Sequence, residues 1–230
     1  MDKLILDNIL PYPLPPWEHD YRVLAVFGEV EEAPLQPLVP PPLKLCSSTV
    51  QISVMYFDSS VPTELYYDAA VIADVEYGGI RGGFWIHGYT STDLVHAGTR
   101  EIWGYRMKRG DDWSLGGDGE HYSGHVARRN KRLIDIKMTV TGKEFNQPKL
   151  FPRLFLKLIP HASHAQAALK KVVVMRAETT AVTVDLKGEA RLSMAPSLQD
   201  PVADLAPVKL LGANYIEGHQ ILPWAEEVDV

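Results

Sequence analysis

The chain has 230 residues, 46% of them hydrophobic and 23% charged, so it can bury a sizeable core within one domain. Its 23 Lys and Arg residues stand against 29 Asp and Glu residues, and the net charge of −6 disfavours nucleic acid and anionic membranes as partners. We therefore expect the partner to be a small molecule or a second copy of the chain.

The cysteine content and the N-terminal residues predict a cytoplasmic location. Cys46 is the single cysteine, so it has no internal disulfide partner, and no Cys/His spacing typical of zinc surrounds it. Residues 1–17, MDKLILDNILPYPLPPW, lack the basic start and long apolar stretch of a signal peptide. No apolar run approaches the roughly 20 residues of a membrane helix. We expect no metal and no other cofactor.

Two proline clusters lie in the first 45 residues. The prolines of residues 11–16 predict an extended arm, which Tyr12 and Trp17 pack onto the protein. The second cluster, residues 34–45, is predicted to be extended as well. Neither cluster is long enough to be a domain linker, so we predict one domain over residues 1–230 with a proline-rich N-terminal arm.

Segments rich in β-branched and aromatic residues alternate with Gly, Pro and Asp turns along most of the chain. We predict strands over residues 21–27, 50–57, 66–77, 83–89, 133–141, 154–159, 169–174, 179–186 and 190–194. The glycine-rich stretch GGIRGG, residues 78–83, predicts a hairpin turn between two of them. A short helix is expected over 94–100 after a cap at 91–93, and a helical turn near 201–206. So many successive strands predict a mainly β (α+β) protein with a barrel or bent antiparallel sheet.

The stretch REIWGYRMKR, residues 100–109, carries a known motif. It follows the pattern R-E-[IL]-x-[GA]-[YF]-P-K-K at Arg100, Glu101, Ile102, Gly104, Tyr105 and Lys108, and departs from it at Arg106 and Met107. Three more segments agree in order and spacing, namely Tyr66-Tyr67-Asp68, FLKLIP at 155–160 and DLAPVK at 204–209. On these residues the chain resembles the acetoacetate decarboxylase family along almost its whole length. The resemblance implies a bent antiparallel sheet closing into a β-barrel-like fold with a few short helices, and a homo-oligomer.

The motif also implies a change of chemistry. Members of the family decarboxylate β-keto acids through a Schiff base, and the reactive amine is the first lysine of the P-K-K segment, kept neutral in an apolar pocket. That position holds Met107, whose thioether cannot form an imine. Lys108 matches the second lysine. Because neighbouring side chains on a strand point to opposite faces, Lys108 reaches the same pocket only if a bulge shifts the register by one residue.

The resemblance assigns further residues to the pocket. It places the catalytic carboxylate at Asp68, next to Tyr67, and a second pocket position at Ser53, where the family has a glutamate. Arg22 is the nearest candidate for the arginine that the family holds near the substrate carboxylate. Glu101, a motif residue, is a candidate pocket residue, and its alternative role is an ion pair that supports the helix.

A histidine near this pocket offers acid/base chemistry. His87 and Tyr89 are two residues apart on a predicted strand, so they share a face. A histidine with a nearby aspartate suits proton transfer, since the ordinary histidine pKa of about 6.5 lies near working pH. His87 is therefore a candidate partner of Asp68, and its alternative role is a hydrogen bond to a backbone carbonyl.

The replaced pocket residues favour an enzyme that keeps the family's pocket but does not form an imine with its substrate. It would act on an apolar keto compound, a polyketide or β-keto intermediate of secondary metabolism, by noncovalent acid/base or pericyclic chemistry such as cyclisation, dehydration or isomerisation. Asp68 would be the base, His87 and Tyr89 donors, and Met107 part of the wall. Two alternatives stay open: a decarboxylase or aldolase that uses Lys108 as the imine-forming amine, and a non-catalytic protein that binds a small ligand.

Overall fold

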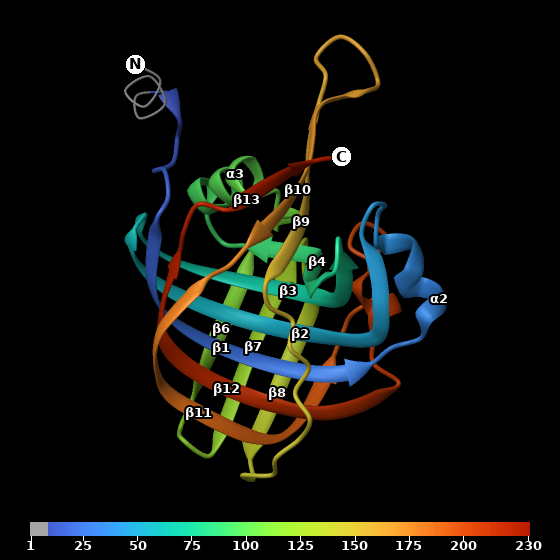
Figure 1. The fold of residues 1–230 in the computed structure, drawn as a ribbon. Helices are drawn as coiled ribbons and strands as arrows, with labels where there is room; N and C mark the ends of the chain where they lie inside the picture. The colour runs from blue at the N-terminus through green and yellow to red at the C-terminus, as the bar shows by residue number, and fades with distance from the viewer. Residues whose placement is uncertain (1–8) are drawn as a thin grey trace.

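A computed structural model describes residues 9–230, which include the predicted proline-rich arm, and residues 1–8 lie outside this range. The chain forms one large bent sheet of mainly antiparallel strands, in the order β13-β10-β9-β4-β3-β2-β1-β12-β11-β8-β7-β6, with β5 paired to β4 (Figure 1). The predicted mainly β, bent antiparallel architecture is confirmed. Within residues 9–230 the end strands β13 and β6 do not pair, so the sheet stays open.

The strands vary widely in length, and the longest of them bend across the molecule. Their bounds are β1 Trp17–Glu29, β2 Lys44–Val61, β3 Thr63–Tyr77, β4 Ile80–Thr90, β5 Met107–Arg109, β6 Asp112–Gly117, β7 His121–Arg128, β8 Lys131–Val140, β9 Arg153–Pro160, β10 Ala167–Met175, β11 Glu178–Ser193, β12 Lys209–Leu222 and β13 Glu226–Asp229. Gly78 and Gly79 make the predicted turn between β3 and β4, both at positive φ.

Helices are few and short, as the sequence predicts. They are α2 Glu32–Leu35, α3 Asp93–Ile102 and the 3-10 turns η1 Gln36–Leu38 and η2 Val202–Leu205. The side chain of Thr92 caps α3 by accepting a hydrogen bond from the Val95 backbone N–H. The extended conformation predicted for residues 34–45 is wrong at its start, because α2 and η1 lie there and a proline occupies the first turn of η1, where no amide donor is needed.

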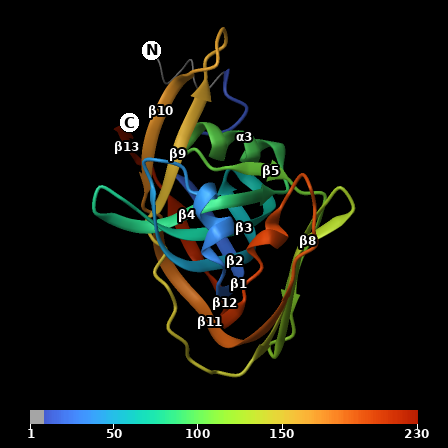
Figure 2. The same cartoon turned by 90° about the vertical axis from the view of Figure 1, so that its right-hand side faces the viewer.

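The two faces of strands β1 to β4 pack against different partners, as Figures 1 and 2 show. One face contacts β7 and β8 of the folded-over sheet and buries the larger core, with Leu24, Val54 and Val71 from one side and Ile136 from the other. The opposite face is covered by α3, the N-terminal arm, β9 and β10. It forms a second, aromatic-rich cluster around Trp17, Trp85, Trp103, Tyr105 and Phe155.

The N-terminal arm closes one end of the second cluster. Trp17 is fully buried, packs edge-to-face on Trp103 at 5.1 Å and donates its indole N–H to the Pro13 carbonyl at 2.9 Å. Tyr12 is buried beside them. A Cβ on Gly98 of α3 would lie 2.6 Å from the Trp17 ring, so the absence of a side chain there lets the helix approach the arm. The predicted packing of the arm by Tyr12 and Trp17 is therefore confirmed for the described residues.

Candidate active site

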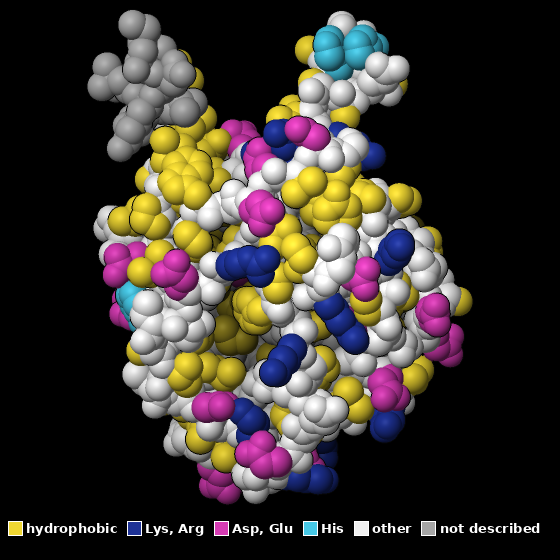
Figure 3. Space-filling view, viewed as in Figure 1, with side chains coloured by type: hydrophobic (Ala, Val, Ile, Leu, Met, Phe, Trp, Pro, Cys, Tyr) yellow, Lys and Arg dark blue, Asp and Glu magenta, His cyan; other side chains and the backbone are white. Residues whose placement is uncertain are grey.

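A cavity of about 310 Å³ lies on the second face of the central strands. The molecular surface is hollowed there, and hydrophobic side chains line the hollow (Figure 3). Most of the wall is apolar or aromatic, including Val23, Met55, Phe57, Trp85 and Met175. Polar and charged groups enter it at separate points: Tyr21, Gln51, Tyr66, Asp68, Thr99, Tyr105, Gln147, Arg153, Thr179, Asp185, Asn214 and Gln220.

A row of small residues makes room for the cavity. The strand registers place Gly88, Ala70, Ser53 and Ala25 side by side on four adjacent strands, with Asn214 of β12 next in line. Ala70, Ser53 and Ala25 are fully or almost fully buried. Ala25 lines the cavity, so a larger side chain at that position would occupy space that the cavity now leaves open.

Asp68 of β3 is the buried carboxylate of the cavity, whereas Asp185 is exposed. Its side chain is 5% exposed, and Oδ1 has no hydrogen-bond partner among the described residues. Burial raises the pKa of Asp68 from 3.8 to about 7, against a smaller opposing effect of the Thr90 hydroxyl. A carboxyl group with this pKa exchanges a proton near neutral pH, which suits it to general acid/base catalysis.

Aromatic side chains surround the carboxyl group. Phe57 and Tyr66 stack with ring centroids 4.8 Å apart. Tyr105, from the loop between α3 and β5, packs on Phe155 at 4.0 Å and edge-to-face on Trp85 at 4.8 Å. Burial raises the pKa of Tyr105, Arg153 partly offsets that rise, and Asp68 adds to it, so the phenol stays protonated and can donate a hydrogen bond.

A buried arginine is the cation of the cavity. Arg153 begins β9, is 6% exposed and has no carboxylate partner within residues 9–230. Its Nη1 donates to the Leu150 carbonyl at 2.8 Å, and the guanidinium lies 4.1 Å from the centroid of the Phe151 ring. Burial lowers the pKa of Arg153 to about 10, so the group remains charged at pH 7. Its remaining N–H groups are available to an oxygen atom of a ligand.

Gly83 of β4 makes space for this arginine. A Cβ at that position would lie 2.4 Å from Nη1 of Arg153 and 2.6 Å from the Leu150 carbonyl oxygen. A side chain on residue 83 would therefore collide with the guanidinium.

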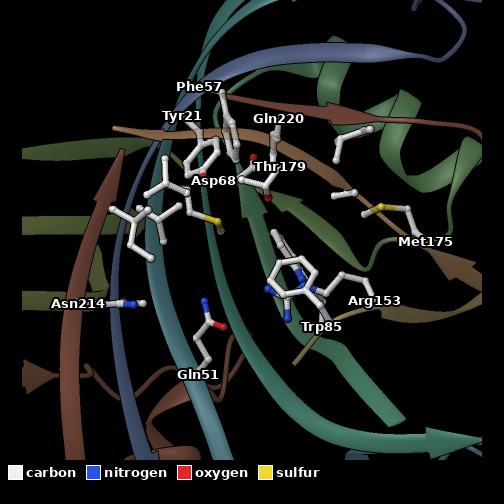
Figure 4. A pocket seen from close by; sticks show the side chains of 18 of the residues that line it. Tyr21, Gln51, Phe57, Asp68, Trp85, Arg153, Met175, Thr179, Asn214 and Gln220 are labelled. Atoms are coloured by element: carbon white, nitrogen blue, oxygen red, sulfur yellow. The ribbon is translucent and has the colours of Figure 1, made fainter. Parts of the chain in front are cut away.

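Amide side chains form a separate polar end of the cavity. Gln51 of β2 and Asn214 of β12 lie toward one end, away from Asp68, Tyr21 and Phe57 (Figure 4). Asn214 is 1% exposed and donates from Nδ2 to Oε1 of Gln147 at 3.2 Å, while its Oδ1 has no partner among the described residues.

Met107 occupies the position of the missing lysine as a packed core residue. It is 1% exposed, pairs with Gly88 and belongs to the aromatic-rich cluster behind the cavity wall. Its sulfur lies 2.6 Å from where a Cβ of Gly88 would be, so it fills the space above that glycine. Met107 is not among the residues that line the cavity, and none of the described lining residues is a lysine.

Lys108 and His87 lie on the opposite face of the sheet from Asp68. Lys108 Nζ donates to Asp200 Oδ1 at 2.7 Å and to the Gln199 carbonyl at 2.8 Å. Burial, with a smaller effect of Lys108, lowers the pKa of His87 to about 4, so this histidine is neutral at pH 7. The structure therefore does not bring either residue together with Asp68 in the cavity.

Tyr89 also lies on that opposite face and joins the Asp200 cluster. Its hydroxyl donates to Asp200 at 3.3 Å, and Arg128 approaches the other oxygen of Asp200 at 3.3 Å. Burial alone would raise the pKa of Asp200, but Lys108 and Arg128 hold it below its usual value. The cluster connects residues 199–200 to β4, β5 and β7.

The remaining predicted pocket residues are also spread over the molecule. Tyr67 points away from the cavity and stacks on Trp113 with ring centroids 6.0 Å apart, because neighbours on β3 alternate between faces. Arg22 is exposed on the face of β1 opposite the cavity, over the Tyr56 ring. Glu101 is exposed on α3 and accepts a hydrogen bond from the Tyr12 hydroxyl.

Ser53 is the one member of that group on the cavity face. It lies between Gln51 and Met55 on β2, is fully buried, and its hydroxyl has no hydrogen-bond partner among the described residues. It belongs to the small-residue row rather than to the cavity lining itself.

Sequence reasoning missed most of the polar residues on the cavity, and three of them are central to the site: Tyr105, Arg153 and Asn214. Tyr105 belongs to the motif and lies two residues before Met107. In an extended segment both side chains would point to the same face, so the sequence did carry a signal for Tyr105. Arg153 follows Phe151-Pro152 at the start of a predicted strand, with no sequence signal that it is buried. Asn214 lies in β12, which the sequence analysis did not predict, because glycines and polar residues interrupt its apolar pattern.

No group of three or more His, Cys, Asp and Glu residues within residues 9–230 is arranged to hold a metal ion. In the same range no helix has the length and apolar content needed to cross a membrane.

The fold and the motifs have counterparts among known proteins. The acetoacetate decarboxylase of Burkholderia vietnamiensis is 25% identical over 223 residues, which cover 94% of this chain and 90% of the relative. The crystal structure of acetoacetate decarboxylase from Legionella pneumophila aligns with a TM-score of 0.86 at 20% identity, covering 97% of this chain and 95% of that one. The enduracididine biosynthesis enzyme MppR complexed with pyruvate aligns with a TM-score of 0.78 at 13% identity, over 94% and 91% of the two chains.

The likeness to these structures shows the fold alone, whereas the family follows from the sequence. A family model described as acetoacetate decarboxylase (ADC) matches residues 8–223, almost the whole chain. The chain therefore belongs to the acetoacetate decarboxylase family.

Proposed function

We propose that this chain is an acetoacetate decarboxylase-like enzyme that moves a proton on a keto compound without forming an imine. The observation that carries the proposal is Asp68, a buried carboxyl group with a pKa of about 7 and an unpartnered oxygen in a cavity whose described lining contains no lysine. The expectation that Met107 forms part of the pocket wall is revised to a position behind that wall.

The residues of the cavity suit proton abstraction next to a carbonyl. Asp68 removes the proton as its carboxylate, and the electron pair moves onto the carbonyl oxygen to give an enolate. Tyr105, which stays protonated, and Arg153, which carries free N–H groups, are the donors that stabilise this oxygen. Return of the proton to another carbon gives isomerisation, attack of the enolate on a second carbonyl gives cyclisation, and loss of hydroxide from the neighbouring carbon gives dehydration.

The substrate proposed here is an apolar keto compound, such as a polyketide or β-keto intermediate of secondary metabolism. The mainly apolar wall of the cavity supports this class, and the MppR structure holds pyruvate on the same fold. A cytoplasmic location and a homo-oligomer remain parts of the same proposal.

One observation argues against the alternative in which Lys108 forms an imine. Lys108 Nζ donates a hydrogen bond to the Asp200 carboxylate on the opposite face of the sheet, and Lys108 is not among the residues that line the cavity of Asp68. A protein that only binds a ligand would share the same cavity, so activity must be measured to separate it from an enzyme.

The first test is exchange of the α-hydrogens of N-butylacetoacetamide in D₂O, followed by proton NMR. The wild type should accelerate exchange over buffer, with a rate that rises through pH 7 as Asp68 ionises, and Asp68→Asn should lower the enzymatic rate by roughly 10²–10⁴-fold. Lys108→Ala should leave it nearly intact. No acceleration by the wild type would favour a binding protein, and a borohydride-trapped adduct on Lys108 with acetoacetate would restore the imine mechanism.

A further inference from the structure

Asn214 has an unused hydrogen-bond acceptor at the polar end of the cavity. Its side chain is 1% exposed, yet Oδ1 has no partner within the described residues, while Nδ2 is already bound to Gln147. A buried polar atom without a partner is costly, so such an atom in a cavity indicates a group that arrives with the ligand. An acceptor needs a donor, which a ketone or carboxylate cannot supply.

The neighbouring amide of Gln51 strengthens this interpretation. Gln51 lines the same end of the cavity, and no hydrogen bond of its amide is found within residues 9–230. It offers both a donor and an acceptor to the group that contacts Asn214. The two amides therefore make one end of the cavity polar, in contrast to the aromatic surroundings of Asp68.

The strand order fixes how far this end lies from the carboxylate. Asp68 is on β3 and Asn214 on β12, with β2 and β1 between them, so three strand spacings separate the two backbones. At about 4.8 Å per spacing this is about 14 Å of sheet. A ligand that contacts both residues must be longer than a three- or four-carbon keto acid, and a cavity of about 310 Å³ accommodates such a ligand.

We propose that Asn214, with Gln51, forms a specificity subsite for a hydroxyl or amide N–H group on the tail of the substrate. The substrate would then be an extended keto compound whose reacting carbonyl lies near Asp68 and whose tail donates a hydrogen bond to Asn214 Oδ1. The inference rests on the proposed function for the position of the keto group, but the subsite itself is defined by binding and needs no turnover.

Matched acetoacetamides test the subsite. N-(3-hydroxypropyl)acetoacetamide and N-butylacetoacetamide differ only in a terminal hydroxyl or methyl group, and titration calorimetry on the full chain gives the dissociation constant of each. We expect the wild type to prefer the hydroxyl compound by tenfold or more, because only its tail can pair with the buried acceptor (about tenfold per hydrogen bond). The N-(3-methoxypropyl) compound, which cannot donate, should bind no better than the butyl compound. N-(2-amino-2-oxoethyl)acetoacetamide identifies whether an amide N–H serves better than a hydroxyl.

Variants assign the preference to the subsite. Asn214→Leu should reduce the hydroxyl-to-butyl ratio to about one, and Asn214→Asp, which retains an acceptor oxygen, should keep it. Gln220→Leu, at the Asp68 end of the cavity, should change both dissociation constants alike and leave the ratio intact. Circular dichroism checks that each variant is folded.

The outcomes separate the subsite from the proposed reaction. Equal affinity of the wild type for the two tails, or a preference that survives in Asn214→Leu, overturns the subsite, and the first of these needs no variant to fold. A clear preference together with absent hydrogen exchange would instead retain the subsite and refute the proton-transfer reaction.

Discussion

Replacing Asp68 by Asn should stabilise the protein, and the gain should grow with pH. Folding raises the pKa of this carboxyl from 3.8 to about 7, so the folded state favours its protonated form. The stability that this group contributes is fully present below pH 3.8 and is lost as pH rises through about 7. At about 1.4 kcal/mol per pKa unit, this pKa difference lowers the stability of the folded protein by about 4 kcal/mol above pH 8 and by about 1.5 kcal/mol at pH 5, where folding requires Asp68 to take up a proton.

The amide group introduced by Asp68→Asn does not ionise, so the variant escapes this cost. Urea unfolding of both proteins at pH 5 and pH 8.5 should show that the advantage of Asp68→Asn increases by about 2.5 kcal/mol between the two conditions. Asp58→Asn, on the exposed end of β2, serves as the control and should show no comparable change. An advantage of Asp68→Asn that is the same at both pH values would refute the argument that burial raises the pKa of Asp68.

Three further changes probe the surroundings of the cavity. Asp200→Ala should lower the free energy of unfolding by about 3 kcal/mol, because it removes the buried carboxylate that pairs with Lys108 and Arg128. Lys108→Ala should lower it by only about 1 kcal/mol, because Lys108 is partly exposed. Equal losses for the two variants in urea unfolding would contradict this ranking. Met107→Lys should destabilise the fold and yield a borohydride-trapped adduct with acetoacetate that the wild type lacks, whereas a folded variant without adduct would show that this position cannot reach the cavity. Gly83→Ala should displace Arg153 and weaken binding of N-butylacetoacetamide, the proposed test ligand, by about tenfold, and unchanged affinity would exclude the guanidinium from ligand binding.

The sequence predicted the architecture well where one local signal was sufficient. The Gly78-Gly79 turn, the cap of α3 at Thr92 and the apolar strands near 50–57 and 66–77 all depend on local residue chemistry, and the structure contains each of them. Strand β12 was missed because Gly212 and Gly218 avoid contacts with Phe145 and Tyr21, so its interrupted pattern is explained only by residues far away in the chain.

The site was harder to predict, because membership of a cavity depends on register between strands. His87 and Tyr89 share a face, as predicted, but pairing Ala69 with Tyr89 places that face opposite Asp68. A bulge in β4 also matters: Val71 pairs with His87 and Ile72 with Trp85, so one extra residue turns Trp85 toward the cavity. Alternation along one strand cannot reveal either fact.

The small-residue row has a consequence for how this pocket could change over time. The backbone of β1 to β4 is held by the core on its other face, so a methyl group added at Ala25, which lines the cavity, would shorten the cavity without disturbing that core, and enlargement of Ser53 or Ala70 would act from the adjoining positions of the row. Under the proposed function, these few side chains would limit the length of the substrate separately from Asp68, the proposed base. If the residues of the row were replaced one after another by larger ones, long substrates would be excluded first and short substrates last.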